Sequence, residues 1–237
     1  MSTLTIGLVL PDVLGTYGDD GNALVLRQRA RMRGIDAEIH KIRLGEPVPT
    51  QLDVYCLGGG EDTAQIIATE HLKGDGGLRK VADAGVPIFA VCAGFQILGT
   101  SFRAGGTEVT GLELIDATTT TLKTRSIGEV TAAPIGGGLT DTFTGFVNHM
   151  GATTLGPDAQ ALGTIITGPG NTDQDQRSYE GATQGSIICT YMHGSAFARN
   201  PQLADLLLAQ ATGTTLAKLA PLDIPVVEKL RRERLGR

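Results

Sequence analysis

One cysteine stands at a junction that suits nucleophilic chemistry. Cys92 ends the apolar run 86–91 and is followed by Ala93 and Gly94, after which residues 95–98 have the pattern of a helix. A buried strand that turns sharply at a thiol places the sulfur at the sheet edge, as a nucleophile elbow places its serine. The N-terminus of the next helix favours the thiolate form. Taken alone, the segment is equally compatible with a buried structural cysteine.

Two further strand-like runs end in turns that could serve the same chemistry. Residues 53–57 lead into three glycines at 58–60, and residues 187–191 lead into Met192, His193 and Gly194. In a parallel α/β sheet the carboxyl ends of the strands lie along one edge, where ligands bind. His193 can then act as general base for Cys92, while the glycine turn and the amide of Ala93 suit an oxyanion hole. This set indicates acyl transfer through a thioester.

Composition excludes several other classes of function. A formal net charge of −5 argues against nucleic acid or an anionic membrane surface as the main partner. The three cysteines are scattered through apolar runs, which is neither a disulfide framework nor metal-ligand spacing, so we expect a reducing cytoplasm. Residues 3–10 lack a basic leader and a cleavage site and are interpreted as a first strand. No apolar stretch approaches the roughly 20 residues of a membrane span.

The order of predicted elements defines the fold class. Strands alternate with helices in the first half, which predicts an α/β fold with a central, mainly parallel sheet flanked by helices. The expected strands there are 4–10, 37–42, 53–57 and 86–91, and the expected helices are 22–33, 63–69, 78–84 and 95–98. After Gly111 the chain is β-rich, and antiparallel strands are expected at 118–122, 128–133, 142–148, 161–167 and 178–182, covering one edge of the core.

The remaining segments complete a single domain over residues 1–237. Residues 187–191 form a further buried strand, and residues 203–210 form a helix after Pro201. The basic, amphipathic tail at 226–237 is expected to be a solvated helix, with a partner contact as the alternative.

Motifs spread over nearly the whole chain carry a family resemblance. The most specific motif is Tyr-Gly-Asp-Asp-Gly-Asn at 17–22. The other motifs are at 33–35, 58–65, 92–96, 125–129, 145–149, 179–181 and 190–194. With these motifs the chain resembles the triad-type (class I) glutamine amidotransferases. More narrowly, it resembles the cobyric-acid-synthase-like branch, and within that branch the glutaminase subunits of lipid II isoglutaminyl synthases.

The resemblance assigns roles to matching positions. Cys92 would be the nucleophile and His193 its base. Gly59 and Ala93 would supply oxyanion N–H groups, and Gln96 would line the glutamine pocket. Arg125 would hold the α-carboxylate of glutamine, a role that suits its bidentate fork.

Two positions depart from the family pattern. Ser195 stands where most triad amidotransferases have a glutamate two residues after the histidine, although the branch as a whole lacks that glutamate. The acid that orients His193 is therefore open: the candidates in this chain are Asp19, Glu61 and Glu180, and our hypothesis is a carboxylate supplied in trans by a partner. The second departure is Val147, where close relatives are expected to have glutamate. It favours a structural role for the neighbouring His149.

The same resemblance implies a reaction and a partner. The chain would hydrolyse L-glutamine and pass ammonia to a Mur-ligase-like subunit of the MurT type in a heterodimer. That partner would bind ATP and Mg²⁺ and amidate the α-carboxyl of D-glutamate in lipid II, giving the D-isoglutamine of peptidoglycan. No cofactor is expected in this chain, which lacks a Gly-x-x-x-x-Gly-Lys-Ser/Thr loop. The lipid-linked acceptor would bring a cytoplasmic enzyme to the inner face of the membrane.

Two alternative functions remain open at this level. The first is an amidotransferase subunit that serves cobyrinate or another small-molecule acceptor. The second is a non-catalytic binding module on the same fold. The joint presence of Cys92, Gln96 and His193 favours an active enzyme.

Overall fold

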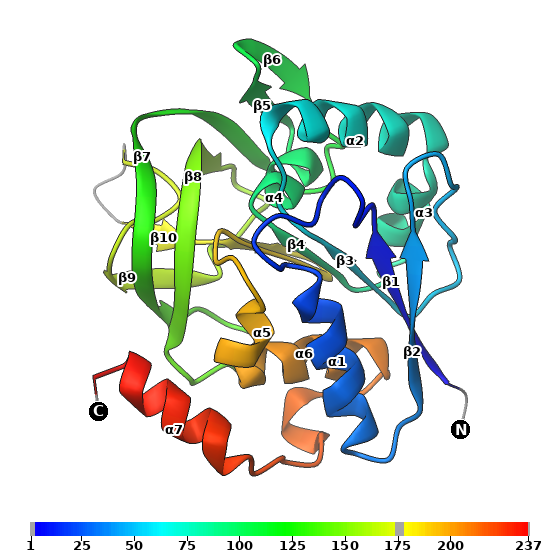
Figure 1. The fold of residues 1–237 in the computed structure, drawn as a ribbon, viewed down its shortest axis with the longest axis vertical. Coiled ribbons are helices and arrows are strands. Elements are labelled where there is room, and N and C mark those ends of the chain that lie inside the picture. The colour runs from blue at the N-terminus through cyan, green and yellow to red at the C-terminus, as the bar shows by residue number, and fades with distance from the viewer. Residues whose placement is uncertain (1–2, 174–177, 237) are drawn as a thin grey trace.

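The computed structural model describes residues 3–173 and 178–236 and contains two six-stranded sheets (Figure 1). The first half of the chain comprises β1 (Leu4–Val9), α1 (Gly21–Arg31), β2 (Ala37–Ile42), β3 (Val54–Leu57), α2 (Asp62–Asp75), α3 (Gly77–Asp83), β4 (Ile88–Val91) and α4 (Ala93–Leu98). The strands that follow are β5 (Ser101–Ala104), β6 (Thr107–Thr110), β7 (Ala117–Pro134), β8 (Phe143–Leu155), β9 (Gly163–Thr167), β10 (Tyr179–Glu180), β11 (Ala182–Gln184) and β12 (Ile187–Thr190). The chain then forms α5 (Ala196–Arg199), α6 (Pro201–Ala211), the 3-10 helix η1 (Leu216–Lys218) and α7 (Pro225–Arg234).

The first sheet brings together the three turns that carry candidate catalytic residues, at 58–60, 92–94 and 192–194. Its order is β11-β12-β4-β3-β1-β2, and every pair is parallel except β11 with β12. All residues of β3, β4 and β12 are buried, as expected for strands covered on both faces. Leu57 pairs with Ala90, and Val91 pairs with Thr190, so these strands end at one edge. The predicted α/β fold with a mainly parallel sheet is confirmed.

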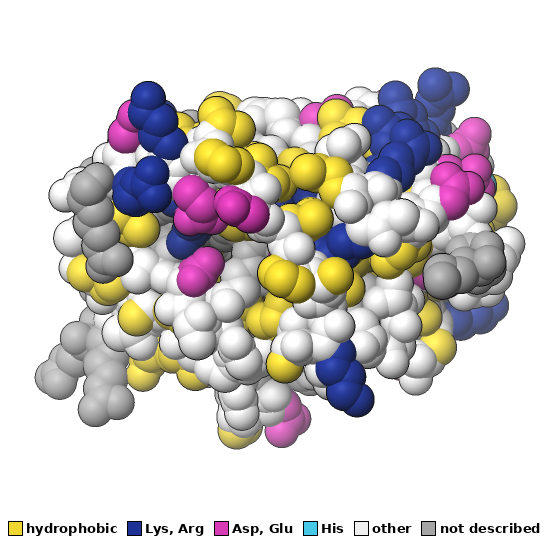
Figure 2. Space-filling view, turned by 90° about the horizontal axis from the view of Figure 1, so that it is seen from below, with side chains coloured by type: hydrophobic (Ala, Val, Ile, Leu, Met, Phe, Trp, Pro, Cys, Tyr) yellow, Lys and Arg dark blue, Asp and Glu magenta, His cyan; other side chains and the backbone are white. Residues whose placement is uncertain are grey.

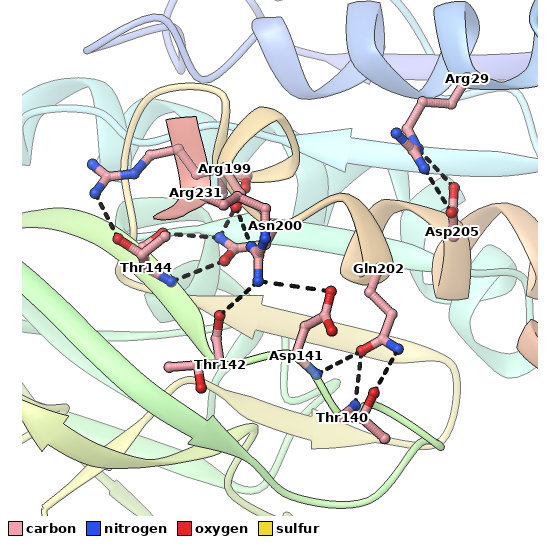
Figure 3. A network of polar contacts seen from close by, with 11 residues as sticks. Arg29, Thr140, Asp141, Thr142, Thr144, Arg199, Asn200, Gln202, Asp205 and Arg231 are labelled. Atoms are coloured by element: carbon pink, nitrogen blue, oxygen red, sulfur yellow. Dashed lines mark hydrogen bonds and ion pairs between the residues drawn. The ribbon is translucent and has the colours of Figure 1, made fainter. Parts of the chain in front are cut away.

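Two groups of helices enclose this sheet. Helices α2, α3 and α4 lie on one side in Figure 1, and α1, α5 and α6 lie on the other. The second group is held together by charge as well as by packing. Asp205 of α6 accepts hydrogen bonds from Arg29 of α1 at 2.6 and 2.7 Å (Figure 3). It also accepts one from Arg33 at 2.8 Å. Bidentate arginine–carboxylate pairs of this kind also fix geometry.

The second sheet covers one edge of the core, as predicted, but β7 and β8 are longer and β9 and β10 shorter than the sequence suggested. Its order is β10-β9-β7-β5-β6, with β8 also paired to β7. The two strands expected at 118–122 and 128–133 are one strand, β7, whose register with β8 breaks between Thr121 and Ser126. The polar stretch 123–126, which suggested a break between two strands, forms an irregularity inside one strand. The hairpin of β5 and β6 was not predicted.

The basic C-terminal tail is a helix with one face docked on the chain itself. Arg231 of α7 is 5% exposed; it donates hydrogen bonds to the carbonyl oxygens of Arg199 and of Thr142, the latter at 3.1 Å, and pairs with Asp141 at 3.6 Å (Figure 3). From below, Lys and Arg side chains form separate groups beside acidic ones rather than one basic surface (Figure 2). The helix was therefore predicted correctly, while the docking of Arg231 was missed.

Candidate active site

Cys92 occupies a strained turn between β4 and α4. Its backbone has φ 51° and ψ −105°, a conformation that residues with a Cβ rarely adopt. The turn is fixed from both sides, since the Cys92 N–H donates to Thr190 O at 2.9 Å and Gln96 N–H donates to Cys92 O at 3.1 Å. Only 8% of Cys92 is exposed. The geometry is that of a nucleophile elbow, as the sequence predicted.

His193 is brought to Cys92 from the end of β12. The main-chain N–H of His193 donates to Phe146 O at 2.8 Å, and the ring nitrogen Nδ1 lies 3.0 Å from Asp19 Oδ2. The Nε2 atom has no nitrogen or oxygen partner in the described part of the chain. Burial alone would lower the pKa of His193, but the hydrogen bonds with Asp19 and Cys92, and the charges of both groups, raise it to about 10. The imidazole is therefore poised to carry a proton beside the sulfur.

Asp19 is the acid that orients His193. The carboxylate is 2% exposed and also accepts the N–H groups of Gly59 at 2.8 Å and Gly194 at 2.9 Å. The hypothesis of a carboxylate from a partner is wrong for this nitrogen, because Nδ1 is already paired within the chain. Ser195, which replaces the usual glutamate, has a buried Oγ without a partner among the described residues.

The other two candidate acids lie elsewhere. Glu61 is exposed and lines the rim of the cavity beside the glycine turn. Glu180 is buried behind β12, where its Oε1 accepts hydrogen bonds from Thr190 Oγ1 at 2.5 Å and Tyr191 N–H at 2.9 Å. Burial raises the pKa of Glu180 to about 7. Neither carboxylate is hydrogen-bonded to His193.

Gly59 has a different role from the predicted one. Its N–H donates to Asp19 and is not free to hold an oxyanion. What the position requires is the absence of a side chain, because a Cβ there would lie 2.7 Å from His193 Cε1 and 3.3 Å from Cys92 Cβ. The N–H groups of Gly60 and Ala93, both lining the cavity, have no acceptor among the described residues. The N–H of Ala93 is thus available for the predicted oxyanion role, and the N–H of Gly60 is available for it where that of Gly59 is not.

Gln96 lines the cavity as predicted, but its amide is already engaged. Its Oε1 accepts from Gln65 Nε2 at 2.8 Å, and its Nε2 donates to the Tyr191 hydroxyl at 3.0 Å. Because both ends of this buried amide are paired, Gln96 shapes the cavity wall.

A cavity of about 560 Å³ opens above Cys92 and His193. At its rim, exposed Arg125 donates from Nη1 to Asn148 Oδ1 at 2.8 Å, and Asn148 Nδ2 donates to the Tyr17 hydroxyl at 2.7 Å. The Tyr17 ring in turn lies 4.7 Å, centroid to centroid, from the ring of His193. We call Tyr17, Arg125 and Asn148 the rim chain. Tyr17 and Asn148 were not predicted as site residues, although they lie in the family motifs at 17–22 and 145–149.

The other two cysteines differ from Cys92. Cys56 in β3 and Cys189 in β12 are fully buried, and burial raises the pKa of Cys56 to about 12 and that of Cys189 well above its usual value. Buried thiols of this kind are unreactive. Across residues 3–173 and 178–236 no group of three His, Cys, Asp or Glu side chains is placed to hold a metal ion. No helix in these ranges is long and apolar enough to cross a bilayer.

Comparison with known proteins identifies the class. Residues 5–201 match the CobB/CobQ-like glutamine amidotransferase domain, and the chain belongs to this family. A crystal structure of a glutamine amidotransferase shares the fold with a TM-score of 0.57 and 18% identity, covering 87% of this chain and 98% of that chain.

Two relatives narrow the comparison within the family. The chain is 34% identical to the GatD subunit of the glutamine-hydrolysing lipid II isoglutaminyl synthase of Staphylococcus aureus, over 89% of this chain and 85% of the relative. It is 30% identical to the subunit of the same name from Streptococcus pneumoniae, over 88% of this chain and 80% of the relative.

Proposed function

We propose that this chain is the glutaminase subunit of a lipid II isoglutaminyl synthase. The observation that carries the proposal is that Cys92 and His193 line a cavity whose rim presents Arg125, while the buried carboxylate of Asp19 holds His193 Nδ1 at 3.0 Å. Similarity to two GatD subunits over most of both chains supports the choice of acceptor.

The first half of the reaction forms a thioester. Cys92 Sγ attacks the carboxamide carbon of glutamine, and the carbonyl π electrons move to the oxygen. The N–H groups of Ala93 and Gly60 stabilise this oxyanion. As the oxyanion re-forms the carbonyl, the C–N bond breaks and the nitrogen takes the proton of His193, leaving as ammonia.

The second half returns the enzyme to its starting state. His193, now neutral at Nε2, removes a proton from water as the oxygen attacks the thioester. The C–S bond then breaks, glutamate leaves, and the sulfur and His193 regain their original protonation. Asp19 keeps the proton of Nδ1 in place through both steps, which fixes the tautomer that makes Nε2 available.

The proposed partner consumes the ammonia. A Mur-ligase-like subunit of the MurT type would use ATP and Mg²⁺ to activate the α-carboxyl of D-glutamate in lipid II, and ammonia would then form the D-isoglutamine amide. The arrangement of this chain supports such a division of labour because its cavity holds groups for amide hydrolysis.

The alternatives differ in acceptor and in chemistry. A subunit for cobyrinate or another small molecule would retain the same site but would not amidate lipid II. A binding module would not need Asp19, which is buried and serves His193 directly. The complete site therefore argues against the second alternative.

Transfer of labelled nitrogen tests the proposal. The complex of this chain with the Mur-ligase-like subunit is given lipid II, ATP and glutamine labelled with ¹⁵N at the side-chain amide. The label is expected in the α-amide of lipid II. With Cys92→Ser the transfer from glutamine should stop, while amidation from free ammonia should continue. Amidation of cobyrinate but not lipid II would establish the first alternative.

A further inference from the structure

A histidine that the proposed reaction does not use lines the same cavity. His149 of β8 is 3% exposed and lines the cavity together with Cys92, His193 and Arg125. Its Nδ1 lies 2.8 Å from Gly151 O, and because a carbonyl only accepts, Nδ1 carries the hydrogen. The other nitrogen, Nε2, is then a lone-pair acceptor unless the ring is charged. It has no donor among the described residues.

The surroundings keep this acceptor neutral and fixed in place. Burial lowers the pKa of His149 to about 4 despite the hydrogen bond to Gly151, and the charges of His193 and Arg125 act in the same direction. The ring stacks on Tyr191 at 3.8 Å, and the Tyr191 hydroxyl is held by Gln96 and Thr153. A buried acceptor without a donor destabilises the free enzyme, because its lost hydration is not replaced. A ligand that supplies a hydrogen-bond donor to Nε2 restores this lost stabilisation.

Position decides which donor of glutamine can reach His149. On the β7–β8 ladder, His149 pairs with Ser126, the neighbour of Arg125. The α-carboxylate and the α-ammonium of glutamine are attached to the same carbon, so a residue that binds one must lie near the residue that binds the other. If Arg125 holds the carboxylate, the ammonium is presented beside His149.

We infer that Nε2 of His149 accepts a hydrogen bond from the α-ammonium group of bound glutamine, which makes His149 a specificity-determining residue for α-amino acid amides. The inference rests on the proposed function, because it takes glutamine as the substrate and Arg125 as the ligand of its carboxylate. The competing acceptors are the carboxylates at the cavity rim. Asp62 already accepts from Gly105 N–H at 2.7 Å, which leaves Glu61 as the matched control.

The test compares L-glutamine with glutaramate, the same amide without the α-amino group, in the complex with the ligase subunit. Asn at position 149 can keep the donor to Gly151 but loses the Nε2 acceptor, whereas Gln can restore an acceptor there. His149→Asn should lower kcat/KM for glutamine by about 10- to 100-fold and that for glutaramate much less. His149→Gln should retain part of the preference, and Glu61→Gln should leave it within about twofold.

The opposite results would overturn the inference. An equal loss for both substrates in His149→Asn would mean a structural role only. Loss of the preference in Glu61→Gln and not in His149→Asn would assign the ammonium to Glu61. Failure of the wild-type complex to release ammonia from glutamine would contradict the proposed function instead.

A second measurement leaves position 149 intact and covers the case of a misfolded variant. In the Cys92→Ser complex with ¹⁵N-labelled histidine, glutamine should move the Nε2 resonance of His149 in the direction of an accepted hydrogen bond. Glutaramate should not. Equal shifts with both ligands, or no shift with either at saturation, would contradict the inference.

Discussion

The reactive end of the cavity and its rim are built in different ways. Cys92, His193 and Asp19 are almost fully buried, and main-chain hydrogen bonds hold the elements that carry them. The rim chain is connected through side chains alone, and Tyr17 is 48% exposed. Side-chain contacts at a surface rearrange at a low cost in free energy, whereas rearranging a buried charged network costs much more. The reactive end is thus preorganised for chemistry, and the rim can adjust to the substrate.

The largest effect should come from the nucleophile. Cys92→Ser is expected to reduce ammonia release from glutamine to background, because a serine hydroxyl is a far weaker nucleophile than a cysteine sulfur. The fold should remain, as judged by circular dichroism, since one atom changes. Ammonia release at the wild-type rate from the serine variant would show that Cys92 is not the nucleophile.

The next largest effect should come from the orienting acid. Asp19→Asn removes the charge that helps to hold a proton on His193, so we expect kcat to fall by roughly 10² to 10⁴. The pKa of His193, about 10 in the wild type, should move down. Because His193 would then lose its proton at a lower pH, the alkaline limb of the plot of kcat/KM against pH should shift to lower pH. A profile of kcat/KM against pH for both proteins measures this, and an unchanged limb would argue against the pairing.

A smaller effect, of a different kind, is expected at the rim. Arg125→Ala should raise KM for glutamine by about 10- to 100-fold, the range of a hydrogen bond to a charged group, with less change in kcat. The control substrate is 4-aminobutanamide, which is glutamine without its α-carboxylate. If this amide loses as much as glutamine does, Arg125 does not bind the carboxylate.

The smallest effect tests the support of Arg125. Tyr17→Phe removes the hydroxyl that accepts from Asn148 and keeps the ring beside His193. We expect KM to rise by about two- to tenfold with kcat nearly unchanged, because one hydrogen bond at a half-exposed site is lost. A larger fall in kcat than rise in KM would place the hydroxyl in the chemistry and remove the contrast between rim and reactive end.

The same contrast explains what the sequence could predict. Cys92 and His193 end apolar runs that become neighbouring parallel strands, so strand pattern alone brings them to one edge. Asp19 lies in a loop 174 residues from His193, and no periodicity links the two. The wrong prediction for Gly59 has the same cause. Its N–H is free for an oxyanion only if no acceptor lies nearby, and the sequence does not show that the Asp19 carboxylate lies there. Likewise, one strand was predicted as two because the polar residues 123–126, at the register break of β7, resemble a loop.

Glutamine hydrolysis by the isolated chain tests the central claim most directly, namely that Cys92, His193 and Asp19 form a complete catalytic group within one chain. Purified without a ligase subunit, the wild-type chain should release ammonia from glutamine, and Asp19→Asn should lose nearly all of this activity while retaining its fold. A wild-type chain that is inactive until the partner is added would contradict this claim, if replacement of a partner carboxylate, rather than of Asp19, then abolishes the activity of the complex.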